Sequence, residues 1–473
     1  MTEPVPTGVP PLPGPRPRVV VPYPRLSPGL RRYFSTEAGG ATLLLAASAI
    51  ALVWANLPGD SYHHFWDTHA TVDIGDWGID LSLHHWVNDG AMAIFFLVVG
   101  LEVNRELTVG ELRHPRAASV PFLGAVGGLA VPIALYLAIN PSGPDAAGWG
   151  IPMSTDTAFV IGILALVGPR CPDQLRVFLL TLAIFDDIGA IALMGIFYAD
   201  ALDPMALAFV VGLVVVLAAM RWTGVWQVTP YLLVGAGLWV AVLESGLHPT
   251  LAGVAVGLLM PTRKEVHRDE LRRYLSFYGR ALVEETDPIR SRLAVSAARA
   301  AVPAGDRLQE ALHPLSSYLV VPAFGLANAG VVLGAEEVSD ALSSPVTLGV
   351  VVGLFVGKAL GVVAGAAIAL RTGLGALPGQ VRYGHLIGGG FLCGIGFTIS
   401  LFISELAFDD EALVNEAKVG ILVGSVVSAI AGALIVRYFG ERMSLCSPDE
   451  EDGPPPLPEG PWRAPATPWR PPA

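Results

Sequence analysis

Two consecutive aspartates, Asp186 and Asp187, lie in the middle of an apolar run from Phe178 to Met194. The run is long and apolar enough to cross a membrane. A charged residue at the centre of a membrane-spanning helix costs about 2.5–3.5 kcal/mol on insertion scales. Two in succession therefore indicate a function, and the chemistry that buried carboxyl groups offer is the binding of protons or cations.

Asp186 and Asp187 cannot face the same way, because consecutive positions on an α-helix diverge by about 100°. One carboxyl group can face a neighbouring helix while the other faces a water-filled cavity. Double ionisation of adjacent carboxyl groups is unfavourable, so the pair loses its protons in coupled steps. A cation that binds the carboxylates must displace these protons, which is what exchange requires. The alternative is a neutral, hydrogen-bonded structural pair.

Lys358 is the only lysine deep in an apolar segment, within Leu354–Gly361. A lysine at this depth needs an anionic partner or a helix C-terminus. The sequence predicts that it pairs with one of the two aspartates. A purely structural counter-charge is the alternative.

Two apolar segments contain interruptions. Asp156 follows a proline and two hydroxyl residues, including Thr155, and this pattern disfavours an unbroken helix. A break would leave helix N-termini with positive partial charge, which Asp156 can neutralise. The stretch 388–400 holds five glycines together with Thr398. Paired interruptions are typical of the binding site of inverted-repeat transporters, whereas close helix packing through small residues is the alternative.

Composition indicates an α-helical membrane protein. The chain has 473 residues, of which 53% are hydrophobic and 15% are charged, with a mean hydropathy of +0.56. Soluble domains carry about 25% charged residues. The three cysteines are scattered and suggest neither a zinc site nor a disulfide framework. No cofactor and no nucleic-acid partner are predicted.

Twelve apolar segments are predicted to cross the bilayer. They cover about 38–57, 85–105, 117–139, 152–168, 174–198, 204–221, 228–243, 247–260, 314–334, 345–370, 383–407 and 413–438. The loops between them alternate between those that carry arginine and those without Lys or Arg. The positive-inside rule then places both termini in the cytoplasm and supports an even number of spans.

The predicted transmembrane domain is 36–440. The Pro-rich tails 1–35 and 441–473 are expected to be disordered, and 262–312 is expected to be a cytoplasmic connector. The non-basic loop 58–84 contains the stretch Val72–Ile79, which alternates around glycines and predicts a small hairpin.

In seven motifs the chain resembles the NhaA family of sodium/proton antiporters. The motifs are Phe95–Leu107, Thr155–Phe159, Leu182–Ala190, Thr250–Val254, Ala327–Val331, Gly357–Gly361 and Cys393–Ser400. They occur in the order of the family, and the resemblance covers about 36–440. It implies twelve helices in inverted repeats, with discontinuous spans 4 and 11 that cross.

The resemblance also implies roles for individual residues. Asp187 matches the main cation- and proton-binding carboxylate, Asp186 its partner, and Lys358 the coupled charge. Thr155 and Asp156 match residues at the helix crossing, where Thr398 also lies, and Thr155 is a further oxygen for the transported sodium. The implied activity is electrogenic, pH-regulated exchange of cytoplasmic Na⁺ or Li⁺ for external H⁺ by alternating access. The implied location is the bacterial inner membrane, with a homodimer formed through 58–84.

The pH response is where the sequence departs from the family. Glu102 and His248 match positions that the family ties to this response, although surface electrostatics and a structural histidine are their alternatives. Gln309 stands where a glutamate is expected, and the neighbouring Glu310 is the candidate replacement. Pro249 stands where relatives often have alanine. These departures concern the pH profile and not the transport class.

Two other functions compete with exchange. An intramembrane aspartyl protease also uses buried aspartates, but from different helices that face one water, whereas this pair is contiguous. A passive cation channel builds its filter from symmetric rings or carbonyl loops, whereas this chain shows one internal acidic pair. The sequence therefore predicts a transporter and not an enzyme.

Overall fold

The computed structural model describes residues 37–442, with short gaps and one long one. The residues outside it within this range are 76, 111, 112, 114, 168–172, 199–201, 333, 335–340, 342, 376–380, 382 and most of 263–301. The predicted N-terminal tail, nearly all of the C-terminal tail and most of the connector 262–312 lie outside the described residues.

Helices occupy each of the twelve predicted segments. The first eight hold α2 (Glu37–Ala55), α4 (Leu83–His85) with η1 (Trp86–Ala91) and α5 (Met92–Thr108), α6 (Pro115–Ile139), α7 (Thr157–Val167), α8 (Asp173–Phe197), α9 (Pro204–Trp222), α10 (Val228–Leu243) and α11 (Thr250–Leu259). The last four hold α14 (Ala304–Leu315) with η5 (Ser316–Val320) and α15 (Val321–Asn328), α17 (Pro345–Val352) with η6 (Gly353–Gly357) and α18 (Lys358–Arg371), α19 (Tyr383–Leu392) with α20 (Phe397–Ala407), and α21 (Glu411–Arg442).

Six helices of the described part are long and apolar enough to cross a bilayer, and the bent α19–α20 pair makes a seventh candidate. Three shorter apolar helices cover 39–55, 228–243 and 250–259. The number is below twelve because several predicted segments are not single long helices. The fourth segment, for example, holds α7, which has 11 residues. The fold is therefore that of a mostly helical membrane protein.

Two segments are interrupted, as the sequence predicts. The prediction of a helix from 152 is wrong in its first part, because a 3₁₀ helix, η3 (Pro144–Met153), is followed by extended residues 154–156. Pro152 has no amide hydrogen to donate, which disfavours an α-helix through this stretch. The second interruption separates α19 from α20, which meet at an angle of 45°.

Two further elements flank the bundle. The predicted hairpin is present and longer than expected: β1 (His69–Ile74) pairs antiparallel with β2 (Trp77–Ser82), after the short helix α3 (Ser61–Trp66). Helix α14 begins at Ala304, inside the predicted connector, so the predicted start of the ninth segment at 314 is ten residues too late. The polar sequence of α14 explains why hydropathy does not reveal it.

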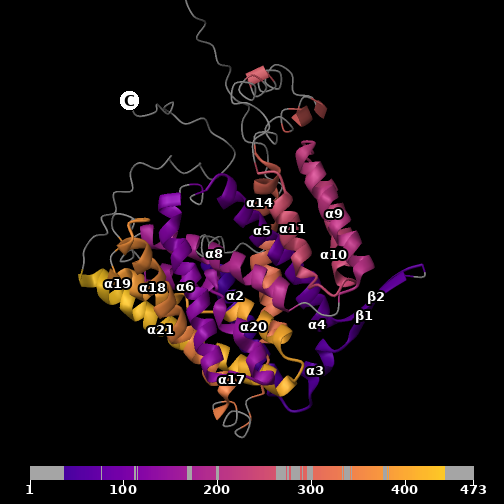
Figure 1. Cartoon of the computed structure of the whole chain (residues 1–473). Helices are drawn as coiled ribbons and strands as arrows, with labels where there is room; N and C mark the ends of the chain where they lie inside the picture. The colour runs from indigo at the N-terminus through magenta and orange to yellow at the C-terminus, as the bar shows by residue number, and fades with distance from the viewer. Residues whose placement is uncertain are drawn as a thin grey trace, which may run out of the picture.

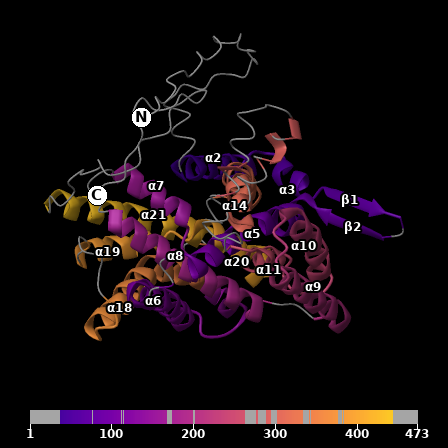
Figure 2. The same cartoon turned by 90° about the horizontal axis from the view of Figure 1, so that it is seen from above.

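The helices form two packed groups. The core group contains η3, α6, α7, α8 and α17–α21, and the panel group contains α2, α4, α5, α9–α11, α14 and α15 together with α3 and the hairpin. Both views show α18, α19 and α21 on one side and α9–α11 with the hairpin on the other (Figures 1 and 2). The groups meet where α2 packs on α7, α5 on α8, and α15 on α20.

Within the core group, α6 and α18 lie in backbone contact through glycines. A Cβ at Gly127 would lie 2.1 Å from the carbonyl oxygen of Gly361, and one at Gly361 would lie 2.1 Å from that of Gly127. Only glycine permits this approach, as at other small-residue helix contacts in membranes. The contact brings Lys358, at the start of α18, against the middle of α6, where a Cβ at Gly128 would lie 3.7 Å from its Nζ.

We expect Gly127→Ala to destabilise the protein by about 1–3 kcal/mol, because the new methyl group meets backbone that cannot move aside. Gly212→Ala on α9 is the matched control, since a Cβ there has nothing within 4 Å. The measurement is the thermal unfolding temperature of the purified protein in detergent. Equal unfolding temperatures for the two variants would contradict this account of the α6–α18 contact.

Candidate functional site

A buried ion pair lies at the centre of the core group. Lys358 Nζ lies 2.6 Å from Asp186 Oδ2, and both side chains are fully buried. Lys358 follows directly after the π-helical turn η6, and Asp186 lies in the middle of α8. The anionic partner that the sequence requires for this lysine is therefore Asp186. Removing either charge leaves the other buried and uncompensated, which is strongly unfavourable.

Thr155 joins this ion pair to the two helix breaks. Its hydroxyl lies 2.6 Å from Asp186 Oδ2 and 2.9 Å from the carbonyl oxygen of Cys393. Cys393 is the first residue after α19. One side chain of the first break thus contacts both the acidic pair and the backbone of the second break.

Asp156 neutralises the helix ends at the point where the breaks cross. Its backbone N–H donates to the carbonyl of Ile395 at 2.6 Å. Its carboxylate accepts from the backbone N–H and the hydroxyl of Thr398, at the start of α20, and from the N–H of Phe159, at the start of α7. A carboxylate at two helix N-termini balances their positive partial charges. The crossing therefore ties the two half-helices into one unit.

Asp187 faces away from the ion pair, into a cavity of about 320 Å³ between the core and panel groups. Thr155, Asp156 and Thr398 line this cavity from the core group, and Glu102 lines it from α5. Asp187 Oδ1 is buried and has no hydrogen-bond partner among the described residues, and the same holds for Asp186 Oδ1. Buried carboxyl oxygens without donors are suited to hold a proton or a cation.

The charges around Asp187 are mostly negative. Asp186, Glu102 and Asp156 all act on it electrostatically, while Lys358 is the cation that opposes them. Four carboxyl groups thus share one buried lysine. Such a site stabilises a bound cation or proton, because either one relieves the mutual repulsion of the carboxylates.

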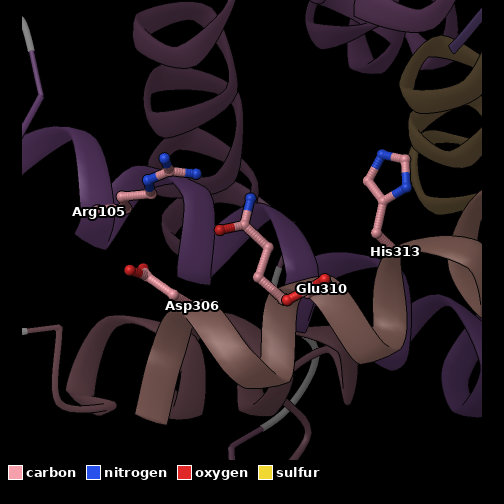
Figure 3. A pocket seen from close by; sticks show the side chains of 5 residues that line it. Arg105, Asp306, Glu310 and His313 are labelled. Atoms are coloured by element: carbon pink, nitrogen blue, oxygen red, sulfur yellow. The ribbon is translucent and has the colours of Figure 1, made fainter. Parts of the chain in front are cut away.

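The mouth of the cavity lies between α5 and α14. Arg105, Gln309 and His313 line both this cavity and a second one of about 370 Å³, to which Asp306 and Glu310 also contribute. Figure 3 shows Asp306, Glu310 and His313 along α14, with Arg105 of α5 at the end of the cavity near Asp306. We call this side of the molecule the Arg105 face and the side with β1, β2 and α3 the hairpin face.

Two predicted pH-response residues do not reach the Asp187 cavity. Glu310 is exposed and lines only the second cavity, whereas its neighbour Gln309 lines both. His248 lies at the start of the α11 segment, where its Nε2 hydrogen-bonds to the carbonyl oxygen of Tyr198, just after α8. Only Glu102 of the three predicted residues shares the cavity with Asp187.

The predicted sodium ligands are two carboxylates, Asp186 and Asp187, and the hydroxyl of Thr155. Within the described part of the chain, no group of three or more His, Cys, Asp or Glu side chains is arranged to hold a metal ion. Asp186 already accepts a hydrogen bond from Thr155. Of the two carboxylates, Asp187 is therefore the one that is open to the cavity.

Sequence reasoning missed several polar contacts. Glu405 of α20 and Lys418 of α21 form an ion pair at 2.7 Å. Asn88 of η1 and Asn328 of α15 exchange hydrogen bonds through their side-chain amides. Each of these residues is a polar interruption in an apolar run, and that signal is visible in the sequence, but the partner of each one is not.

An apolar helical bundle whose buried carboxylate faces a cavity at crossing helix breaks belongs to the class of membrane ion transporters, and not to the enzymes. Comparison with known proteins then identifies the family. The family described as Na⁺/H⁺ antiporter 1 matches residues 31–436. The chain belongs to the NhaA family of Na⁺/H⁺ antiporters, and it is a multi-pass membrane protein of that bacterial family.

Curated relatives match over most of their length. Na⁺/H⁺ antiporter NhaA 3 of Frankia alni is 57% identical over 450 residues, which cover 95% of this chain and 96% of the relative. Na⁺/H⁺ antiporter NhaA of Oleidesulfovibrio alaskensis is 42% identical and covers 90% of this chain and 97% of its own. The Janthinobacterium NhaA antiporter is 41% identical over 88% of this chain and 94% of its own.

We expect Lys358→Met to lower the stability by about 3–5 kcal/mol, because Asp186 then remains buried without its cation. The double variant Asp186→Asn/Lys358→Met should recover most of this loss, since neither charge remains. Thermal unfolding of the three purified proteins measures the effect. A double variant as unstable as Lys358→Met would show that the lost charge balance is not the cause.

Proposed function

We propose that the chain exchanges cytoplasmic Na⁺ or Li⁺ for external H⁺ at Asp187, with Asp186, Lys358 and Thr155 as the coupled groups. The observation that carries this proposal is the placement of the two aspartates. Asp187 faces the cavity with a buried carboxyl oxygen that lacks a donor, while Asp186 holds Lys358 at 2.6 Å. One carboxylate is thus open to an ion from water, and the other forms an ion pair with a lysine.

Competition between protons and the cation for the same oxygens would drive the exchange. Sodium binds after Asp187 has lost its proton, and Thr155 is close enough to supply a hydroxyl oxygen. Protons that arrive from the opposite side neutralise the carboxylates and displace the cation. Because proton binding to Asp186 also removes the partner of Lys358, more than one proton can move for each cation, and the transport is then electrogenic.

Alternating access at the crossing is the mechanism that we propose for the two breaks. The broken segments before α7 and between α19 and α20 meet at Asp156, as expected for spans 4 and 11 of two inverted repeats within twelve spans. The cavity lies between the core and panel groups, so a change in their relative position can close it on one side and open it on the other.

The Arg105 face is the cytoplasmic side in this proposal. The alternation of arginine-bearing and non-basic loops supports this orientation, with both termini in the cytoplasm and the protein in the bacterial inner membrane. The hairpin then lies on the external side. The strands β1 and β2 form the surface through which we propose a homodimer.

The pH response is assigned to the cytoplasmic approach to Asp187. Glu102 supports this proposal most directly, because it shares the cavity and acts electrostatically on Asp187. Glu310 has a lesser part, because it lines the second cavity and not the Asp187 cavity. His248 would act through its hydrogen bond to the chain that follows α8.

We expect Asp187→Asn and Asp186→Asn to abolish exchange while the protein still inserts into the membrane, because each removes a carboxylate that binds the ion or the proton. The assay is fluorescence dequenching in everted vesicles that hold a pH gradient, with sodium, lithium or potassium added in turn. Asp409→Asn, an exposed aspartate, is the matched control and should retain activity. Unimpaired exchange by Asp187→Asn would refute the assignment.

We expect Glu102→Gln to shift the pH profile of exchange toward lower pH. The substitution removes a negative charge from the wall of the Asp187 cavity that attracts protons into it, so sodium can compete at lower pH. Glu310→Gln, at an exposed position, is expected to shift the profile less. The test is the same vesicle assay repeated across a pH series, and a larger shift for Glu310→Gln would reverse this assignment.

A further inference from the structure

The Asp187 cavity is closed toward the hairpin face by three phenylalanines. Phe402 of α20 packs against Phe96 of α5 and Phe324 of α15, with ring centroids 5.6 and 6.3 Å apart. None of the three side chains is more than 1% exposed. Phe324 and Phe402 each lie one helical turn beyond a residue that lines the cavity, Val321 and Ile399 respectively. We call these three residues the aromatic plug.

The plug joins the two helix groups. Phe402 belongs to the core group, whereas Phe96 and Phe324 belong to the panel group. The plug is made only of ring contacts, so parting it deprives no polar group of a hydrogen bond.

Beyond the plug, the two panel helices are tied together by polar bonds. Asn88 Nδ2 donates to Asn328 Oδ1 at 3.1 Å, and Asn328 Nδ2 donates back to Asn88 Oδ1 at 2.8 Å. His84 Nε2 lies 3.1 Å from Asn328 Oδ1. Tyr62 of α3 donates its hydroxyl to the backbone carbonyls of Leu326 and Ala327. We call the reciprocal Asn88–Asn328 pair the amide clamp.

The chemistry of the two contacts decides which one can part. Separating α5 from α15 would leave the Oδ1 atoms of both asparagines without their donors, and an unsatisfied buried polar group is strongly unfavourable. Moving α20 away from both helices parts the ring contacts, which are individually weak, and takes Glu405 away from His84 and Tyr62. The separation of α20 is therefore the less costly way to open this face.

The charge nearest to the plug also stays balanced if α20 moves. Glu405 lies one turn beyond Phe402 and acts electrostatically on His84 and Tyr62 of the panel group. Its ion-pair partner, however, is Lys418 of α21, which belongs to the core group. When the two groups separate, the Glu405–Lys418 pair remains intact.

We propose that the hairpin face opens when Phe402 on α20 withdraws as a unit from Phe96 and Phe324, while the amide clamp keeps α5 and α15 joined throughout transport. The clamp and its two helices form a fixed jaw, and α20 is the moving jaw. This inference rests on the alternating access proposed above, but it assigns a gate that is distinct from the ion site.

Two cross-links test the assignment in a background whose three native cysteines are replaced by serine. The first pair, Asn88→Cys/Asn328→Cys, links the fixed jaw within itself. The second pair, Phe324→Cys/Phe402→Cys, links the moving jaw to it. A short, reducible bifunctional thiol reagent joins each pair, and sodium/proton exchange is measured before linking, after linking and after reduction.

We expect the linked first pair to keep most of its exchange rate. The linked second pair should lose activity by roughly an order of magnitude, because a required conformational step is blocked, and should regain it on reduction. Loss of exchange in the first pair, or retention in the second, would overturn the proposal. Exchange by the unlinked proteins tests the ion site separately. A failure of the proposed function can therefore be distinguished from a failure of this inference.

If a cysteine variant is inactive before linking, a proton-leak measurement tests the aromatic plug instead. Phe402→Ala opens a route from the hairpin face to the Asp187 cavity, so proteoliposomes should show faster proton entry without sodium. Phe391→Ala is the matched control, since Phe391 pairs with Phe355 at 5.1 Å within the core group. Equal proton tightness in the two variants would contradict the plug.

Discussion

The ion pair between Lys358 and Asp186 is the constraint on which the rest of the structure depends. Two charges without solvent exposure are tolerated only if they lie at hydrogen-bond distance and the surrounding chain satisfies them. The backbone contact of Gly127 with Gly361 brings α18 close enough to α6 to place the lysine, and Thr155 reaches the same carboxylate from the first helix break. Close packing, the broken helices and the buried charge thus depend on one another.

The pair also determines what Asp187 can do. Because Asp186 is occupied by the lysine and by Thr155, the neighbouring carboxylate is left to face the cavity. The 100° that separates consecutive positions on a helix gives two chemically identical residues different environments, one dry and paired, the other open to an ion. Asp156 adds a further carboxyl group at the crossing, which is held by the N-termini of α7 and α20.

Much of this site could be predicted from sequence, because a charge in an apolar run is itself a strong signal. The divergence of Asp186 and Asp187, the need of Lys358 for an anion, and the breaks at Asp156 and around Gly388–Ser400 all follow from local rules. The sequence does not say which aspartate holds the lysine, since that depends on the register between α8 and α18. The distance between residues of two different helices produces no periodic pattern in the sequence.

Other features were missed for physical reasons that can be named. Helix α14 is polar and short, so hydropathy treats it as part of the connector, although it forms the mouth of the cavity with Arg105. Asn88 and Asn328 are 240 residues apart, and each alone is unremarkable as a polar residue near the end of an apolar segment. Their meaning arises only from the way the panel helices pack.

The π-helical turn η6 has a consequence for how this chain tolerates length changes. Such a turn holds one more residue than an α-helical turn, and here it comes immediately before Lys358. Deleting a single residue from Gly353–Gly357 would let the helix relax to regular α geometry without breaking it. The parts before and after the deletion would keep nearly the same orientation, because a π turn with its extra residue covers about the same angle as the α-helical turn that replaces it. The extra residue is therefore accommodated within the turn, so one half of the helix keeps its packing against α21 and the other half its packing against α6.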